Sequence, residues 1–241
     1  AGNGGINDRA DLYDSNGNDY FVSRAGALVN PISYIQRTSG GTGTAAFVQA
    51  TSGFEYVYGM ATAGGVDEAV LFGSNGDDTM VFQPGYSPIQ TRAYMTRPGG
   101  YFIYAMSFKK VTGYPDAGND TVAFYDTAGN DTFTASPTRA ELVGPAGSNI
   151  WNIAVPDVGI PANKWDTVLA YSQVGGYDKA YLTGTTGDDT FTALGMPRTT
   201  YPSGMGPGYA RLAGTGYSLR VATFDEVYAT VLTCDQDVAV L

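Results

Sequence analysis

Histidine is absent from this sequence of 241 residues, and there is one cysteine, Cys234. Without histidine the chain lacks the usual general base, the nucleophilic triads that contain histidine, and the commonest ligand of transition metals. A single cysteine forms neither an intrachain disulfide nor a cysteine-based zinc site. The sequence therefore argues against enzymes of these classes, and we assign no catalytic residue from it.

Basic residues are also scarce. Lysine and arginine total 13 against 23 acidic residues, which gives a net charge of −10 and a pI near 4.2. Nucleic acid is therefore not an expected partner, because phosphate binding needs clustered basic side chains. No run of 18 apolar residues occurs, so no membrane-spanning helix is predicted. The chain starts with AGNGG, without Met or a signal-like segment, which suggests a mature product or a piece of a longer protein.

What the sequence does contain favours strands and turns. Glycine occurs 33 times, proline 12 times and tyrosine 18 times, and no stretch shows the 3.6-residue period of an amphipathic helix. An all-β fold is predicted, and the length allows one large domain.

A repeat of about 58 residues runs through the whole chain. It is seen by aligning five aspartates that recur at nearly even intervals, the first four of which each stand nine residues before a glycine: Asp8, Asp67, Asp120, Asp178 and Asp237. We interpret residues 1–241 as a single repetitive β domain. Its repeats cover approximately 1–54, 55–108, 109–165 and 166–224, with a partial copy at 225–241.

A shorter step of 11 to 12 residues occurs inside each copy, as at Glu55, Asp67 and Asp78. Each acid opens an alternating run with two inward residues, for example Ala69 and Leu71, and period-two alternation is typical of strands with one buried face. We therefore predict a parallel β-helix, or β-solenoid, with roughly two coils per copy. Antiparallel meanders in a propeller-like ring are the alternative, and a β-sandwich ranks third.

The turn motif of the repeat suggests calcium. GSNGDDTMV (73–81) and GTTGDDTFT (184–192) match most of the nonapeptide of RTX calcium-binding repeats, whereas Asp14 and Asp126 replace the first glycine in the other two copies. Turn oxygens of that pattern can surround a hard cation. The motif occurs only once per copy, however, so turn capping through backbone N–H groups is the first interpretation and calcium the second. The candidate ligands are Asp19, Asp78, Asp131 and Asp189.

Other candidate sites are less specific. The adjacent acids Asp77-Asp78 and Asp188-Asp189 point to opposite faces of a strand, which argues against a shared catalytic role. A lyase-like base is conceivable in the pairs Arg198 with Tyr201 or Arg92 with Tyr94, although surface loops explain these residues equally simply. Two Asn-Asp-Thr sequons, at Asn119 and Asn130, are candidate glycosylation sites. Aromatic residues in loops or irregular strands are candidates for stacking on sugars or on a partner chain: Tyr86, Tyr94, Tyr101, Tyr104, Trp151, Tyr201 and Tyr209.

Most of the chain is similar to repeats in very long secreted or surface proteins of planctomycete-type bacteria. The residues that carry this resemblance are Phe224, Asp225, Val227 and Ala229, then Gly175, Gly176, Asp178, Ala180 and Leu182, then Asp126, Gly129, Asp131, Thr132, Phe133 and Pro137. The resemblance implies an extracellular repeat scaffold and no catalytic residues.

The sequence thus predicts a secreted structural or adhesive protein of a cell-surface layer, filament or extracellular matrix. Its expected partners are further copies, stacked head to tail, or neighbouring repeats of a longer chain, because both chain ends occupy the same phase of the repeat. The alternative is a β-helix that binds or degrades polysaccharide.

Overall fold

The protein is all-β in a computed structural model that describes residues 8–25, 32–39, 48–84, 91–145, 151–156, 164–195, 208–232 and 236–240. Within these residues 21 strands form two sheets and no helix occurs. A helix long and apolar enough to cross a membrane is accordingly not found in these ranges. The all-β prediction is confirmed.

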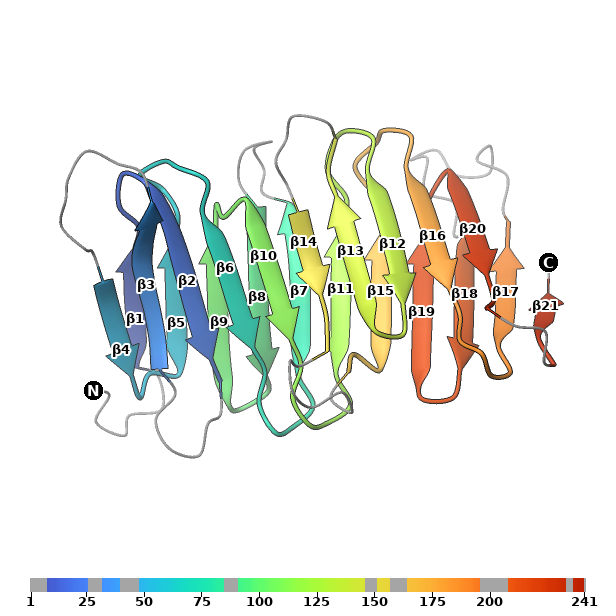
Figure 1. Cartoon of the computed structure of the whole chain (residues 1–241), viewed down its shortest axis with the longest axis horizontal. Coiled ribbons are helices and arrows are strands. Elements are labelled where there is room, and N and C mark those ends of the chain that lie inside the picture. Colours follow the sequence, from blue (N-terminus) through green and yellow to red (C-terminus); the bar gives the residue numbers. More distant parts are fainter. Residues whose placement is uncertain are drawn as a thin grey trace.

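The two sheets lie face to face along the long axis of the molecule (Figure 1). The eleven-stranded sheet contains, in spatial order, β1 (Arg9–Tyr13), β5 (Tyr56–Met60), β9 (Tyr101–Met106), β8 (Thr91–Arg97), β7 (Thr79–Pro84), β11 (Thr121–Tyr125), β15 (Thr167–Tyr171), β19 (Tyr217–Ala222), β18 (Tyr209–Gly214), β17 (Thr190–Leu194) and β21 (Val238–Val240). The ten-stranded sheet contains β20 (Glu226–Thr230), β16 (Lys179–Thr183), β12 (Thr132–Ser136), β13 (Arg139–Val143), β14 (Trp151–Ala154), β10 (Lys110–Tyr114), β6 (Glu68–Phe72), β2 (Asn18–Arg24), β3 (Ile32–Ser39) and β4 (Val48–Ser52).

The core lies between the sheets and follows the alternation of the sequence. In β5, Val57 and Gly59 are buried while the tyrosines beside them are not, and the inward pairs predicted in β6, β7, β13, β15 and β16 are buried as well. The pair predicted in β17, Phe191 and Ala193, is only half-buried. Phenylalanine rings connect the strands along the axis: Phe124 stacks on Phe82 with ring centroids 4.6 Å apart. One continuous apolar cluster therefore runs from end to end.

Most neighbouring strands are parallel, and the exceptions have a regular arrangement. Four three-stranded antiparallel meanders, β2–β3–β4, β7–β8–β9, β12–β13–β14 and β17–β18–β19, alternate between the two sheets. Between meanders the chain crosses from one sheet to the other with single strands. The fold therefore combines parallel pairing with the antiparallel meanders that were expected only in the alternative architecture.

The repeat has a different geometry from the one predicted. Strands that follow one another at the shorter step, such as β5, β6 and β7, lie in alternate sheets, so this step crosses the molecule and does not stack neighbouring rungs. Stacked acids of neighbouring parallel strands are instead 42 to 48 residues apart. The prediction of two coils per copy is therefore wrong. The long repeat switches sheets, since β1, β11 and β21 belong to one sheet and β6 and β16 to the other.

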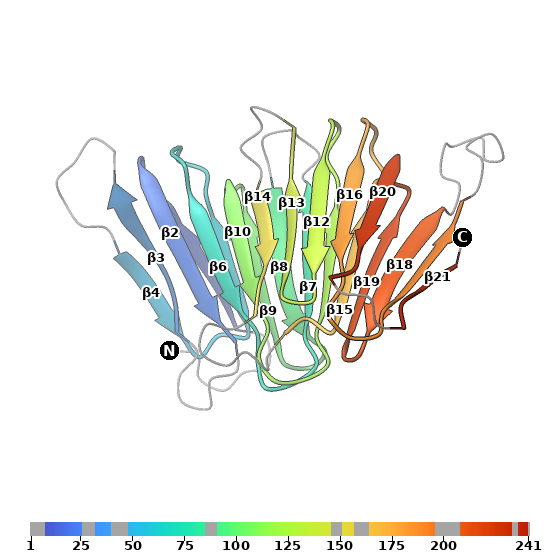
Figure 2. The same cartoon turned by 45° about the vertical axis from the view of Figure 1, so that its right-hand side comes forward.

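Among the described strands, both sheets finish in an edge strand at each end of the molecule (Figure 2). β1 and β4 form one end and β20 and β21 the other, and each of these four strands has a single hydrogen-bonded neighbour within its sheet.

Candidate metal centres

Acidic residues at strand starts form hydrogen-bonded ladders that tie neighbouring strands together. In each case the backbone N–H of one acid donates to the side chain of the acid on the next strand of the same sheet. The bonds are Asp8 to Glu55 (3.0 Å), Asp19 to Asp67 (2.7 Å), Asp78 to Asp120 (2.8 Å), Asp120 to Asp166 (2.9 Å), Asp131 to Asp178 (2.7 Å), Asp178 to Asp225 (2.8 Å) and Asp189 to Asp237 (2.9 Å). The ladders satisfy N–H groups at points where the chain enters a sheet.

The four aspartates predicted from the motif also cap their own turns. Asp19, Asp78, Asp131 and Asp189 each accept the backbone N–H of the Ser or Thr four residues earlier, at 2.5 to 3.1 Å, and the hydroxyl of that residue. All four are about 1% exposed. The capping hydrogen bonds expected from the sequence are therefore present.

The turns are of two kinds, which differ at the first motif position. Where it is Gly73 or Gly184, an added Cβ would approach or overlap the Oδ2 atom of Asp78 or Asp189; at Gly73 the separation would be 2.6 Å. Where it is Asp14 or Asp126, a carboxylate is added to the cluster instead. Only these two of the four motif turns therefore combine an acid at the first position with the capping acid.

The first cluster consists of Asp14, Asp19 and Asp67. One carboxylate oxygen from each lies within 4.8 Å of those from the other two, so the group could hold a metal ion. Asp14 follows β1, Asp19 opens β2 and Asp67 precedes β6, which is the parallel neighbour of β2. Side chains from two successive passes of the chain thus meet at one crossing between the sheets.

The second cluster, Asp126, Asp131 and Asp178, occupies the corresponding positions. In the first cluster the Ala63 N–H donates to Asp14 Oδ2 at 2.8 Å, and in the second the Val174 N–H donates to Asp126 Oδ2 at 2.9 Å. Asp126 and Asp131 are 0% and 1% exposed, and the Oδ1 atom of each is buried without a hydrogen-bond partner. Among the described residues, three acids approach within 4.8 Å in the first cluster alone, so the second is the wider of the two.

Burial is the main cause of the electrostatic perturbation in both clusters. It raises the pKa of Asp67 to about 6, with the neighbouring Asp14 and Asp19 adding to the effect. It also raises the pKa of Asp131 to about 6, where Asp178 and Asp126 add to it, and it raises the pKa of Asp126. Desolvation and like charges both disfavour the ionised carboxylate, so these groups need a proton or a cation.

The paired acids lie in different environments. Asp77 is exposed and accepts the backbone N–H of Asn119 at 2.9 Å, whereas Asp78 is buried in its turn. Asp188 likewise accepts the Gln236 N–H at 3.1 Å. Each carboxylate is thus held by a separate turn, and the two members of a pair do not share an open surface.

The two sequon asparagines are both exposed. Asn130 Oδ1 accepts the Tyr177 N–H at 2.9 Å, the same bond that Asn18 makes to Val66 in the first copy. Asn130 therefore has a structural reason to stand at this position, independent of any glycan. Glycosylation at Asn119 and Asn130 stays a prediction.

The aromatic candidates divide into separate groups. Tyr94 and Tyr104 lie on the outer face of the eleven-stranded sheet, together with Tyr58 and Phe102, with ring centroids 5.5 to 6.1 Å apart. Trp151 is 41% exposed on the ten-stranded sheet. Arg92 lies in β8 two residues before Tyr94, Tyr101 opens β9 and Tyr209 opens β18. The other residues proposed for sugar or lyase contacts, Tyr86, Arg198 and Tyr201, lie outside the described residues, as do Cys234 and the ends of the chain.

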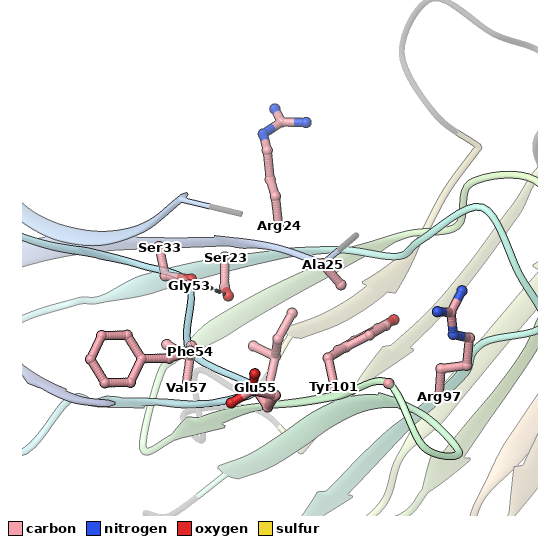
Figure 3. A pocket seen from close by; sticks show the side chains of 12 residues that line it. Ser23, Arg24, Ala25, Ser33, Gly53, Phe54, Glu55, Val57, Arg97 and Tyr101 are labelled. Atoms are coloured by element: carbon pink, nitrogen blue, oxygen red, sulfur yellow. Dashed lines mark hydrogen bonds between the residues drawn. The ribbon is translucent and has the colours of Figure 1, made fainter. Parts of the chain in front are cut away.

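A cavity of about 210 Å³ opens between the sheets near the β4 end. It is lined by residues of β2, β3, β5, β8 and β9 and of the turns beside them, and Figure 3 shows the Arg24 side chain pointing away from the other lining groups. The charged groups are engaged elsewhere: the Arg24 guanidinium lies over the Phe72 ring, 3.6 Å from its centroid, Glu55 accepts the Asp8 N–H, and Arg97 donates to Ser74 Oγ at 3.2 Å. The sequence did not indicate this cavity, because its walls come from distant segments.

No family model, curated protein or solved structure matches this chain. The similarity to planctomycete-type surface repeats therefore stays a prediction.

Proposed function

We propose that the protein is a β-solenoid that serves as an extracellular structural or adhesive scaffold, and that its open sheet ends pair head to tail with further copies. The supporting observation is a structural equivalence between strands two repeats apart. β20 corresponds to β10, and β4 corresponds to β14. β10 is covered by β14, while β20 lacks a second neighbour among the described strands.

A second copy offers the missing neighbour through its β4. Pairing β4 of one copy with β20 of another reproduces the parallel β10–β14 contact, in which Lys110 lies opposite Trp151. In this register Val48 takes the place of Trp151 and Glu226 that of Lys110. Val48 is 60% exposed, as expected of a residue at an unpaired edge. A contact of this kind does not close on itself, so it propagates into a fibre.

The register makes a specific prediction about assembly. Val48→Glu would place a second negative charge opposite Glu226 and should reduce assembly, while Val48→Lys should preserve it, because like charges directly across a strand pair are destabilising. Val66→Glu is the matched control, since Val66 is 56% exposed but lies in a turn. Sedimentation velocity across a concentration series measures the outcome. A protein that stays monomeric at high concentration, or equal effects of Val48→Glu and Val66→Glu, would refute the pairing.

A second prediction concerns β21, which is equivalent to β1 in the repeat. Where two copies meet, β21 of one copy and β1 of the other would occupy the same position beside β17. β21 has three residues and β1 has five, so β21 is the strand that we expect to be displaced from the sheet. Truncation after residue 232 should therefore leave assembly intact or strengthen it at equal concentration. Loss of assembly in the truncated protein would show that β21 belongs to the interface.

Calcium is the cation we propose for this scaffold. The candidate ligands are carboxylates, and hard oxygen donors suit calcium.

Polysaccharide binding is the second candidate, and the outer aromatic face of the eleven-stranded sheet favours it. Tyr58, Tyr94 and Tyr104 alternate with buried residues, so their rings point away from the core onto a flat face that can stack on sugar rings. If this face binds sugar, Tyr58→Ala with Tyr104→Ala should abolish sedimentation with insoluble polysaccharides, whereas Trp151→Ala should not. Absence of binding by the wild-type protein to a broad panel would remove this candidate.

A further inference from the structure

We propose that the protein binds two calcium-type divalent cations, one at Asp14, Asp19 and Asp67 and one at Asp126, Asp131 and Asp178, and none at the turns that begin with Gly73 and Gly184. The two sites are argued from the structure alone. Only their role, stabilising a scaffold, rests on the proposed function. It replaces four equivalent turn sites with two sites, each built from two passes of the chain.

The fold itself creates each site. The first acid directly follows a strand of the eleven-stranded sheet, the second lies at the start of a strand of the ten-stranded sheet, and the third lies just before the parallel neighbour of that strand. The N–H bond from the second acid to the third, 2.7 Å in both clusters, fixes their separation. The positions of the carboxylates are thus set by sheet pairing before any ion arrives.

Unused oxygens in the second cluster point to a ligand. The Asp126 Oδ2 and Asp131 Oδ2 atoms accept turn N–H groups, but the Oδ1 atom of each has no partner and is buried. A buried carboxylate oxygen without a partner costs free energy, because it has lost its hydration without replacement. Asp178 is 1% exposed as well, so three acids share one desolvated space. A cation bound there would satisfy the unused oxygens, offset the repulsion and draw the acids toward the closer spacing of the first cluster.

The donor set selects the class of ion. The available ligands are carboxylate oxygens, joined by the hydroxyl of Ser15 or Thr127 beside the second acid. Oxygen ligands at flexible positions suit calcium, which accepts six to eight donors, better than they suit zinc, which prefers nitrogen and sulfur. The absence of histidine and of suitable cysteines from the sequence is consistent with such a site.

The glycine turns lack the third acid, although each keeps one buried carboxylate oxygen without a hydrogen-bond partner, Asp120 Oδ2 in the turn of Gly73 and Asp237 Oδ2 in that of Gly184. At Gly184 the missing side chain leaves only Asp189 and Asp237, and the Tyr217 hydroxyl donates to Asp189 Oδ1 at 2.6 Å. A phenol donor therefore does there what a cation would do in the aspartate turns. By the sequence motif alone, the four turns are equivalent candidates for cation binding. In the structure they differ in the side chains that surround the capping aspartate.

Calcium titration by calorimetry, on protein freed of ions with EGTA and then dialysed, tests the inference. The wild-type chain should take up two ions, Asp126→Asn one, and Asp14→Asn with Asp126→Asn none. Asparagine keeps an acceptor for the Ala63 and Val174 N–H groups, so the fold should survive. Asp126→Gly, which copies the turn at Gly73, serves as a second variant. Asp188→Asn, at an exposed acid of a glycine turn, is the control of equal charge and should still bind two.

Thermal unfolding of the same samples gives an independent readout. Calcium should raise the midpoint of the wild-type protein and of Asp188→Asn, and it should have no effect on the double variant. No calcium uptake by the wild-type protein, or unchanged uptake by the double variant, would overturn the inference. Sedimentation of the calcium-loaded monomer separates the two proposals: binding of two ions without assembly supports the sites and refutes only the head-to-tail scaffold.

Discussion

Gly176→Ala is expected to destabilise the protein by about 3 kcal/mol or more, while Gly175→Ala at the neighbouring position should cost only about 1 kcal/mol. Both glycines have positive φ angles, +106° at Gly175 and +118° at Gly176, which would strain any other residue. Of the two, Gly176 alone also faces the preceding pass of the chain, where an added Cβ would overlap the carbonyl oxygen of Gly129. The difference between the two variants therefore isolates the close approach of two turns.

The same contact recurs along the molecule. Gly65 meets Gly17 and Gly118 meets Gly76 in the corresponding places, so the motif glycine of one turn packs against a glycine of the next. Urea unfolding followed by circular dichroism gives the free energies for the Gly175 and Gly176 variants. Gly64→Ala and Gly65→Ala provide a second matched pair, which should show the same order. Equal losses within either pair would mean that backbone strain alone, and not packing between turns, explains the double glycine.

The local pattern was sufficient to predict strands, inward residues and capped turns. Alternation at Ala69 and Leu71 reflects the pleat, and the pleat is the same in any sheet. For that reason the pattern could not tell which sheet a strand would join. An inward pair faces the common core equally well from either side, so the shorter step was interpreted as stacking when it is a crossing between sheets.

The candidate metal centres were only half visible in the sequence. Asp19 and Asp131 were predicted as candidate ligands, but Asp67 and Asp178 reach them from a later pass of the chain, a contact that depends on strand register. A local signal for Asp126 did exist, because it stands where the motif has glycine. It was interpreted as a departure from the calcium pattern, although the extra carboxylate is what distinguishes these two turns.

The protein in EGTA is expected to be more stable near pH 5 than near pH 8, and Asp120 should account for a large part of the difference. This residue is 0% exposed, its Oδ1 accepts the Asp78 N–H at 2.8 Å, and its Oδ2 has no partner. Burial raises its pKa from 3.8 to about 7, and the nearby carboxylates of Asp78, Asp166 and Asp77 add to the shift. Tyr101 is the other titratable group close to it.

The sign follows from proton binding in the two states. Between about pH 4 and pH 7 the folded protein holds a proton on Asp120 that the unfolded chain has released, so the free energy of unfolding falls as pH rises through this window. The full shift corresponds to about 4 kcal/mol. Asp120→Asn keeps the oxygen that accepts the Asp78 N–H and carries no charge at any pH. It should therefore lose a large part of the pH dependence and gain stability at pH 8, while Asp67 and Asp131, whose pKa values burial raises to about 6, supply the remainder.

Urea unfolding at pH 5 and pH 8 in EGTA, for the wild-type protein and for Asp120→Asn, measures this effect. Asp188→Asn removes the same charge from an exposed position and should leave the difference between the two pH values unchanged. If Asp120→Asn retains the wild-type pH dependence, the buried ladder is charged throughout the range and its repulsion must be offset elsewhere. If Asp120→Asn reduces the pH dependence and Asp188→Asn does not, Asp120 is neutral in the folded protein. A proton on Asp120 would then relieve charge repulsion beside the eleven-stranded sheet, as the proposed cations do beside the ten-stranded sheet.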